Sequence, residues 1–401
     1  MARNRSGIRE RLGLRPVINV AGTMTGLGAS IASEEAIRAA AEILPEFVEI
    51  DDLQRLASRV IGRITGAEAG CVTASASAGV TISIAAAMTG ADLARVEQLP
   101  DTTGMKDEVP VQSGHLCHYG APVEQAVRLA GATVVRLGAV NAARPDQLEA
   151  RITERTAAVL FVVSHHTVQH GQIALEDVVA VCRRADVPLI ADLAAEYDLT
   201  GYLSRGVDLA IYSAHKFLGG LTAGIVAGAK PLVRAAYLQN LGIGRGMKVG
   251  KEGIVGAIAA LEAWEKRDHE AARRRQQDHL ALWRERLADL PGVRLAPSPD
   301  PTGNPVERLR LHVDPKDAGI TAWELAAALA AGSPPVIVRD EFLEHGCFEL
   351  DPCNLHPGEA EVVAERIADE LQKARAGGRT VHGSLAEHRR ESRKRLLAWP
   401  D

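Results

Sequence analysis

Short apolar runs alternate with helical segments through the middle of this 401-residue chain. The runs predict strands at residues 69–73, 109–112, 133–137, 157–163, 188–192, 209–213 and 224–227. Helical spacing between them predicts helices at residues 78–88, 123–129 and 175–184. Such alternation builds a sheet covered by helices on both faces, and ligands of such sheets bind at the carboxyl ends of the strands. The sequence therefore predicts an α/β fold with a mostly parallel seven-stranded sheet.

The last third of the chain has a different pattern. Residues 254–264 are apolar at helical spacing and residues 265–287 are charged, which predicts one long helix leaving the large domain. A Pro- and Gly-rich segment then begins a smaller C-terminal α/β domain. Its predicted strands are residues 309–313 and 336–339, and its predicted helices are residues 321–330 and 357–374. The expected division is 1–60 as an N-terminal segment covering the site, 61–255 as the large domain, 256–376 as the helix and small domain, and 377–401 as a charged tail.

Composition narrows the class of protein. The formal net charge of −5 argues against a general nucleic-acid binder. The five cysteines form no CxxC pair, so a reducing cytoplasm is expected rather than a disulfide framework. No stretch is long and apolar enough to span a bilayer, and the N-terminus leads into no signal-like apolar region. We expect a cytoplasmic enzyme or binding protein that acts without a membrane.

Two residues at strand ends carry the strongest chemical signal. Asp192 ends the apolar run 187–192, and Lys216 follows the apolar run 207–212 with Gly219 and Gly220 just beyond it. A lysine amine forms a Schiff base with an aldehyde, and an acid opposite a pyridine nitrogen keeps that nitrogen protonated. The alternatives are a surface lysine and a helix-capping aspartate. The pair favours pyridoxal 5'-phosphate as cofactor, with Lys216 as the catalytic residue.

The segment 71–79 predicts where the cofactor phosphate binds. A strand enters a run of very small residues, Ala74 to Ala78, and a helix follows. Small residues expose backbone N–H groups at a helix start, where an anion is stabilised. We therefore expect Ser75, Ala76 and Ser77 to hold the phosphate, although the same pattern fits a tight turn with a serine cap. The hydroxyl of Ser213 and the ring of His215 are further candidates for cofactor binding.

The cofactor ring also needs a flat group on its outer face. Polar and aromatic side chains follow the strand at 109–112. His115 is the preferred candidate, with His118 and Tyr119 as alternatives. A loop histidine also fits a purely structural role.

These motifs resemble those of fold-type-I pyridoxal phosphate enzymes, in the branch that holds bacterial selenocysteine synthase and D-glucosaminate-6-phosphate ammonia-lyase. The resemblance covers about residues 10–375 and rests on five segments, which are 17–28, 64–69, 213–216, 245–252 and 334–339. It implies the roles given above for Lys216, Asp192, Ser75, Ala76, Ser77 and His115. It also implies that Arg339 binds the substrate carboxylate, to which a guanidinium is matched.

The resemblance adds further substrate contacts. The N-terminal segment around Thr25 is expected to lie over the substrate. Lys248 forms a basic cluster with Arg245 and Lys251. The cluster would hold a second substrate anion, or a cofactor phosphate across a subunit interface. The alternative is that these residues form only a solvated charged face. A homodimer or larger homo-oligomer is expected by analogy with fold-type-I enzymes.

Some features depart from the family pattern. The family's phosphate loop usually reads Ser-Gly-Ala-Ala-Ala-Gly, whereas this chain has Ala-Ser-Ala-Ser-Ala-Gly at residues 74–79. Leu221 stands where proline often follows the paired glycines. His165, His166 and His170 cluster after a strand and are candidate acid/base groups. No acid or cysteine spacing accompanies these histidines, so we assign no metal ligand.

The resulting hypothesis is an enzyme that removes the α-proton of an amino acid or amino sugar acid. A β-hydroxyl on the substrate would then be expelled and ammonia lost, which is the reaction of an ammonia-lyase or dehydratase. The same carbanion also permits racemisation, aldol cleavage or β-substitution, and the sequence does not separate them. An aminotransferase, a transferase acting on aminoacyl-tRNA and a non-enzymatic binding protein are the other classes considered.

Overall fold

The computed structural model describes residues 6–377 and 384–400. The chain divides into two compact units. The larger unit is residues 31–267, and the smaller unit combines residues up to 30 with those from 268 onward. The domain division predicted from the sequence, with boundaries after residues 60, 255 and 376, stays a prediction.

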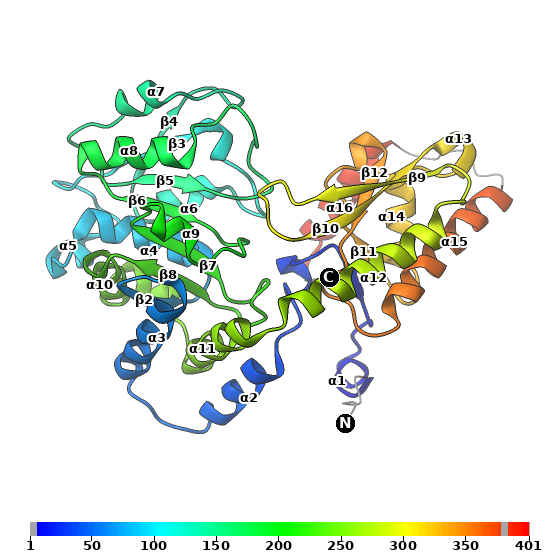
Figure 1. The fold of residues 1–401 in the computed structure, drawn as a ribbon, viewed down its shortest axis with the longest axis horizontal. Helices are drawn as coiled ribbons and strands as arrows, with labels where there is room; N and C mark the ends of the chain where they lie inside the picture. The colour runs from blue at the N-terminus through cyan, green and yellow to red at the C-terminus, as the bar shows by residue number, and fades with distance from the viewer. Residues whose placement is uncertain (1–5, 378–383, 401) are drawn as a thin grey trace. The chain divides into compact units, whose positions relative to one another are not determined.

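The larger unit is built on a mixed sheet (Figure 1). Its strands, in spatial order, are β2 (Ala69–Thr73), β8 (Gly224–Gly228), β7 (Leu209–Ser213), β6 (Leu189–Asp192) and β5 (Val159–Val162). A parallel pair, β3 (Glu108–Gln112) and β4 (Thr133–Leu137), forms a separate two-stranded sheet, and an isolated bridge connects Glu108 to Thr156, three residues before β5. Only β8 runs antiparallel to its neighbours. The predicted α/β fold is confirmed, but the single seven-stranded sheet is corrected, since its strands form a mixed sheet of five and a parallel sheet of two.

Helices cover both faces of this sheet (Figure 1). They are α2 (Glu34–Ile43), α3 (Ile50–Thr65), α4 (Ala76–Thr89), α5 (Leu93–Gln98), α6 (Val123–Leu129), α7 (Pro145–Glu149), α8 (Leu175–Ala185), α9 (Gly201–Ser204), α10 (Lys230–Leu238) and α11 (Lys251–Lys266), with the 3-10 turns η2 (Ser113–His115), η3 (Gln239–Leu241) and η4 (Ile243–Met247). Residues of α3, α8 and α11 fill the core on one face, and residues of α4 and α6 fill it on the other. Helix α4 is apolar nearly all round, which is why it is buried along its length.

The smaller unit has two short sheets and its own core. Its elements are α1 (Ser6–Arg11), β1 (Ile18–Val20), η1 (Thr25–Leu27), α12 (His269–Leu287), β9 (Val293–Pro299), β10 (Glu307–Val313), α13 (Pro315–Ala318), α14 (Ala322–Ala331), β11 (Val336–Val338), η5 (Leu343–His345), β12 (Cys347–Leu350), α15 (Glu359–Ala376) and α16 (Leu385–Leu397). Strands β9, β10 and β12 are antiparallel, and β1 pairs with β11 in parallel. A bridge between Arg339 and Glu349 links the two sheets.

The structure corrects one predicted element. The single helix expected over 254–287 is two helices, α11 and α12. The break lies at Arg267, whose backbone is extended (φ −67°, ψ 135°), and at Asp268, whose carboxylate accepts a hydrogen bond from the N–H of Ala271 at 2.8 Å. The aspartate caps the second helix, so a charged residue inside the pattern marked a helix start. Among the helices of residues 6–377 and 384–400, none has the length and apolarity needed to cross a bilayer.

Candidate active site

Asp192 and Lys216 lie at the same edge of the sheet. Asp192 is the last residue of β6, and Lys216 follows the end of the adjacent parallel strand β7 by three residues. Burial raises the pKa of Asp192, and both the positive charge of Lys216 and the N–H of Ala194, 3.2 Å from Oδ1, act against that rise. The carboxylate and the amine are therefore electrostatic neighbours, as the sequence predicted for a cofactor-binding pair.

A tight loop between β7 and β8 holds Lys216. The N–H of Gly220 donates to the carbonyl of Ala214 at 2.7 Å, and the N–H of Gly219 donates to the carbonyl of Lys216 at 3.1 Å. Gly219 has a φ of +70°, and a β-carbon at Gly220 would lie 2.8 Å from the Ala214 carbonyl oxygen. Glycine is favoured at residue 219 by its left-handed backbone conformation and at residue 220 by the lack of room for a β-carbon.

Ser213 and His215 flank this loop. Ser213 Oγ lies 3.3 Å from His215 Nδ1. Burial lowers the pKa of His215, and the charge of Lys216 lowers it further. A neutral imidazole next to a lysine can offer one N–H to a cofactor oxygen, and the cofactor-binding roles of Ser213 and His215 stay predictions.

The predicted phosphate loop is the start of α4. Ser75 is the N-cap, and its hydroxyl accepts a hydrogen bond from the N–H of Ala78 at 3.1 Å. Ala76 and Ser77 form the first helical positions, where N–H groups have no partner inside the helix. A β-carbon at Gly224 would lie 2.3 Å from the Ser75 carbonyl oxygen, so β8 approaches this turn closely only because residue 224 is glycine. Small residues and free helical N–H groups make this turn suitable for an anion.

His115 lies in η2 and is 4% exposed. Its Nδ1 accepts a hydrogen bond from the N–H of Val162 at 3.2 Å, which places the ring proton on Nε2. The ring meets Phe161 edge-on with centroids 4.6 Å apart, and burial lowers the pKa of His115 to about 4. The imidazole is thus a neutral, fixed ring, and its stacking on the cofactor stays a prediction.

Two neighbours of His115 reach the same site. The hydroxyl of Tyr119 lies 2.9 Å from Ser77 Oγ, which joins the η2 segment to the phosphate loop. Burial raises the pKa of the Cys117 thiol to about 11, and the charge of Asp192 raises it as well. Cys117 was not singled out from the sequence. Its place two residues after His115 was the only available signal.

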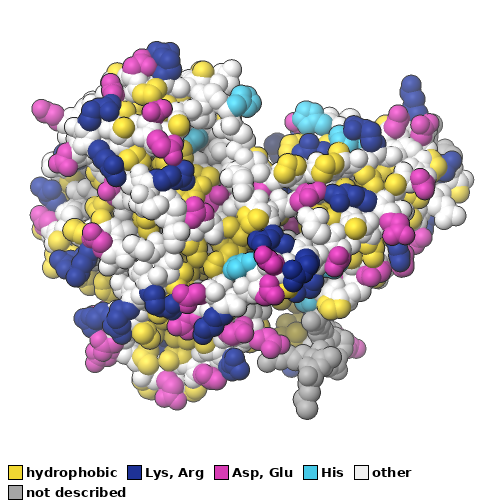
Figure 2. Space-filling view, in the orientation of Figure 1, with side chains coloured by type: hydrophobic (Ala, Val, Ile, Leu, Met, Phe, Trp, Pro, Cys, Tyr) yellow, Lys and Arg dark blue, Asp and Glu magenta, His cyan; other side chains and the backbone are white. Residues whose placement is uncertain are grey.

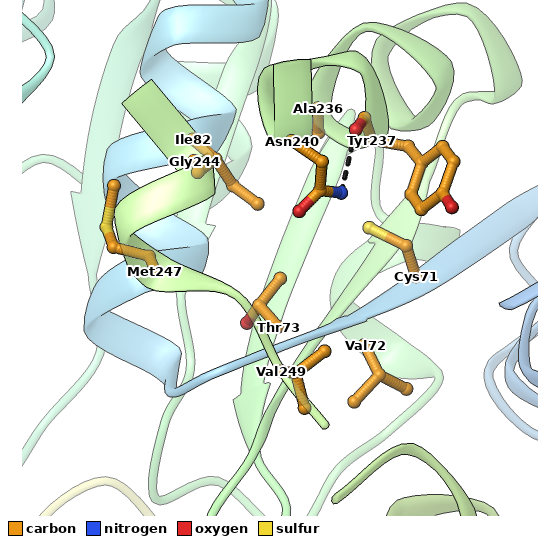
Figure 3. Close-up of a pocket in the computed structure, with 10 residues that line it drawn as sticks. All are labelled: Cys71, Val72, Thr73, Ile82, Ala236, Tyr237, Asn240, Gly244, Met247 and Val249. Atoms are coloured by element: carbon orange, nitrogen blue, oxygen red, sulfur yellow. Dashed lines mark hydrogen bonds between the residues drawn. The ribbon is translucent and has the colours of Figure 1, made fainter. Parts of the chain in front are cut away.

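The basic segment with Lys248 lies beside β2. Figure 3 shows a small pocket lined by Cys71, Val72, Thr73, Ile82, Ala236, Tyr237, Asn240, Gly244, Met247 and Val249. Asn240 donates to the carbonyl of Tyr237 at 2.8 Å across its upper wall. Met247 and Val249 face this pocket from either side of Lys248, which is exposed, and Thr73 precedes Ser75 by two residues. The structure therefore places the backbone of Lys248 near the strand that enters the phosphate loop.

The histidine-rich segment follows β5. The N–H of Val163 donates to the carbonyl of Asp192 at 3.0 Å, and the N–H of Val168 donates to that of Gly114 at 3.0 Å. The rings of His165 and His166 are in contact, with centroids 3.9 Å apart. His170 is exposed. The segment thus spans the carboxyl edge of the sheet between Asp192 and η2, and an acid/base role for it stays a hypothesis.

Thr25 and Arg339 belong to the smaller unit. Thr25 is exposed in η1. The side chain of Arg339 is only 6% exposed, and it forms ion pairs with Glu341 at 3.0 Å and Glu349 at 3.5 Å. Glu341 and Glu349 were not predicted from the sequence. Charged and apolar residues alternate along β10, which indicated a charged sheet face there, but β12 contains a single charged residue and provided no such signal for Glu349.

The residues of the larger unit suit pyridoxal phosphate. A buried carboxylate with a raised pKa faces a lysine at the edge of a parallel sheet, and a helix start of small residues lies at the same edge. The carboxylate matches a protonated ring nitrogen, the amine matches an aldehyde, and the helix start matches a phosphate. The donor set therefore fits the cofactor that the sequence predicted.

Known proteins provide an independent comparison. The profile of the SelA family, L-seryl-tRNA selenium transferase, matches residues 17–282. The D-glucosaminate-6-phosphate ammonia lyase of Salmonella typhimurium is 38% identical over 367 residues, which cover 92% of this chain and 98% of the relative. The 5'-C-glycyluridine monooxygenase-decarboxylase of a Streptomyces species is 35% identical over 364 residues, or 90% of this chain and 91% of the relative.

A more distant relative and two solved structures extend the comparison. The L-seryl-tRNA(Sec) selenium transferase of Shigella flexneri is 30% identical over 279 residues, which cover 62% of this chain and 56% of the relative. A solved structure of D-glucosaminate-6-phosphate ammonia-lyase superposes with a TM-score of 0.84 at 38% identity, covering 93% of this chain and all of that one. The aspartate aminotransferase of Thermus thermophilus superposes with a TM-score of 0.54 at 16% identity, covering 92% and 95% of the two chains, and shares the fold alone.

Proposed function

This chain belongs to the SelA family of pyridoxal phosphate-dependent fold-type-I enzymes, and from that premise we propose that it is an ammonia-lyase acting on a phosphorylated 2-amino-3-hydroxy sugar acid. The observation that carries the proposal is the near full-length similarity to D-glucosaminate-6-phosphate ammonia lyase, 38% identical over 98% of that relative. The proposed active-site residues agree with it, because Asp192 ends β6 and Lys216 follows the adjacent strand β7 by three residues.

Pyridoxal phosphate, when bound, supplies an aldehyde for the substrate amine and a ring that accepts the electron pair left at Cα. Asp192 stabilises the positive ring nitrogen through its negative charge. The start of α4, with Ser75, Ala76 and Ser77, binds the phosphate by backbone and hydroxyl hydrogen bonds. Lys216 takes the proton from Cα, since this residue follows β7 and lies at the same edge of the sheet as Asp192.

The overall reaction balances without an oxidant. The Cα proton leaves to Lys216, and the β-hydroxyl leaves with a proton as water. Cβ then takes up a proton, which converts the resulting enamine into an imine. Water replaces nitrogen at Cα of this imine, so ammonia is released and a 2-keto-3-deoxy sugar acid remains. Lys216 and the histidine-rich segment are the candidate proton donors to the leaving hydroxyl, because both lie at the carboxyl edge of the sheet.

The direct test is an assay of the purified protein with D-glucosaminate 6-phosphate. Ammonia and the keto acid should form in equal amounts, and inversion of the configuration at C2 without ammonia would instead indicate epimerisation, which is the racemase reaction on this substrate. The K216A variant should bind pyridoxal phosphate without the covalent attachment that borohydride traps, and it should release no ammonia. Unphosphorylated D-glucosaminate and both enantiomers of serine serve as substrate controls. Formation of ammonia from serine but not from either sugar acid would contradict the substrate class.

A selenium transferase acting on aminoacyl-tRNA is the second candidate, because the SelA profile matches residues 17–282. The chain spans only 56% of the length of the selenium transferase it resembles. We therefore rank it below the ammonia-lyase. We also propose that the enzyme is a homo-oligomer with a small anionic substrate. A cytoplasmic location is in line with its five free cysteines.

A further inference from the structure

Arg339 belongs to a row of alternating charges across the sheet of the smaller unit. Arg339 and Glu349 exchange backbone hydrogen bonds of 3.0 and 2.9 Å, and Glu349 is paired with Arg310 in the register of β12 and β10. Residues paired across adjacent strands project from the same face of a sheet. The charged row, Arg310–Glu349–Arg339, thus carries a carboxylate between two guanidinium groups.

Glu349 fixes the inner side of the Arg339 guanidinium. Its Oε1 accepts hydrogen bonds from Arg310 Nη2 at 2.6 Å and from Ser298 Oγ at 2.5 Å. Its Oε2 lies 3.5 Å from Arg339 Nε. The side chains of Glu349 and Arg339 are 4% and 6% exposed, so this ion pair is buried inside the smaller unit and is shielded from solvent.

The outer side of the same guanidinium already binds a carboxylate. Oε2 of Glu341 lies 3.0 Å from Arg339 Nη2, and the Glu341 side chain is 28% exposed. Nη1 lies beside Gly22, where a β-carbon would be 3.7 Å from this nitrogen and 2.8 Å from Asp351 Oδ2. Residue 22 has to be glycine here, because a side chain would collide with Asp351 next to Nη1. Nη1 and Nη2 form the edge of the guanidinium away from Nε, and such an edge can bind a carboxylate with two parallel hydrogen bonds.

We infer that Glu341 occupies the anion position of Arg339 until the substrate carboxylate displaces it, while Glu349 holds the guanidinium in place. The inference rests on the proposed function, in which the substrate is a sugar acid. The exchange keeps a second carboxylate, besides that of Glu349, next to the buried guanidinium, so its outer edge is not left without an anion. The incoming carboxylate binds more favourably than Glu341, because it can accept hydrogen bonds from both Nη1 and Nη2, whereas Glu341 accepts one from Nη2. Glu341 then returns to solvent on the side where it is already exposed.

Two non-reacting probes test this exchange on the cofactor-loaded protein. 6-Phospho-D-gluconate has the carboxylate but no amine, and D-glucitol 6-phosphate has a hydroxymethyl group in place of the carboxylate. Isothermal titration gives the dissociation constant of each, and their ratio isolates the carboxylate contribution. In the E341Q variant, 6-phosphogluconate should bind roughly three- to tenfold more tightly, because its competitor has lost its charge, while glucitol 6-phosphate should be unaffected.

The matched control is D340N, which makes the same change in net charge at the exposed residue next to Arg339. D340N should leave both dissociation constants within about twofold of the wild-type values. An unchanged ratio of dissociation constants in E341Q would overturn the inference alone, and so would weaker binding of both probes, which would make Glu341 a substrate contact. Failure of the wild-type protein to bind either probe would overturn the proposed substrate class together with the inference.

Discussion

Asp192 and Asp208 are chemically similar carboxylates at opposite ends of neighbouring strands. Burial raises the pKa of both, yet their surroundings differ. Asp208 lies just before β7 and accepts the N–H of Leu189 at 2.7 Å, which is a structural bond that an asparagine oxygen can also accept. Asp192 lies at the carboxyl edge near Lys216. Position on the strand, and not the residue type, decides which carboxylate has a chemical role.

The first prediction follows from that contrast. D192N removes the negative charge opposite the cofactor nitrogen, so the rate of ammonia release should fall about 10²–10³-fold. D208N should retain near wild-type turnover, because it keeps an acceptor for Leu189. The measurement is kcat with saturating cofactor, together with the absorbance spectrum of each variant. Equal losses in the two variants would mean that Asp192 has only a structural role.

His115 makes a prediction about pH. Burial lowers the pKa of His115 to about 4, whereas the unfolded chain has the ordinary value of about 6.5. Between these values the unfolded state binds the proton and the folded state does not, so this contribution to stability is present above pH 6.5 and is lost as the pH falls toward 4. H115N keeps an acceptor for Val162 but does not titrate. From pH 7 to pH 5, the free energy of unfolding should fall about 2 kcal/mol more in the wild type than in H115N.

Urea unfolding at the two pH values measures this difference in the cofactor-free protein. The other titrating groups are common to both proteins, so they cancel in the comparison. Parallel stability profiles for the wild type and H115N would show that the folded protein can protonate His115 at no cost.

Residue-level signals in the sequence were strongest where chain order and chemistry coincide. Lys216 and Asp192 were identifiable because each directly follows or ends an apolar run that must be a buried strand. Glu349 was not identifiable, because its partners Ser298 and Arg310 lie 51 and 39 residues away and only strand pairing brings them together. Side-chain networks of that kind depend on register, which the pattern of one strand does not contain.

At the scale of elements, the contact between β8 and the start of α4 decides the shape of the phosphate loop. Gly224 begins β8, and an added β-carbon would lie 2.3 Å from the Ser75 carbonyl oxygen and 2.5 Å from Thr73 Oγ1. G224A should therefore push the turn outward, lowering the free energy of unfolding by about 1–3 kcal/mol and weakening pyridoxal phosphate binding. G246A is the control, since nothing lies within 4 Å of its added carbon. Thermal unfolding and cofactor titration give both quantities, and a G224A protein with unchanged cofactor affinity would contradict the assignment of this turn.

The charged row makes a prediction at the same scale. E349Q leaves the buried guanidinium of Arg339 and the partly exposed guanidinium of Arg310 facing an uncharged amide, which should lower the free energy of unfolding by about 3–5 kcal/mol. E341Q alters a partly exposed ion pair and should change the free energy of unfolding by less than about 1 kcal/mol. Urea unfolding of the two variants compares the inner and outer carboxylates directly. Similar small losses in both would mean that Glu349 does not hold the row together.

Element prediction succeeded where a segment is long or strongly apolar. The strands of the large sheet and helices such as α4 and α8 lie close to their predicted positions, because burial on both faces requires continuous apolar runs. The structure also contains β1, β9 and β12, which were not predicted. β1 is three residues long and pairs with β11 more than 300 residues later, so its pairing has no local signal. The break between α11 and α12 depends on a single capping aspartate.

The whole molecule is acidic, yet its charges are mixed. The formal net charge is −5, and acidic and basic side chains are interspersed on the face seen in Figure 2. The C-terminal helix α16 differs, because its 13 residues contain five Arg or Lys and two Glu. A surface of this kind suits a small anionic substrate bound in a local site, since no extended field of one sign covers the visible face.

The final prediction concerns the tRNA-linked chemistry of the more distant relatives. Binding of a large polyanion needs several basic contacts that release counterions, and an overall charge of −5 opposes such contacts. We expect no retarded band when this protein is mixed with tRNA at roughly physiological salt, under conditions where a bacterial L-seryl-tRNA(Sec) selenium transferase gives one. A chain ending at residue 377 tests the basic tail separately, because any weak complex formed at low salt should disappear with α16. A complex that survives both the added salt and the truncation would place an RNA-binding surface outside α16 and would favour the transferase over the ammonia-lyase.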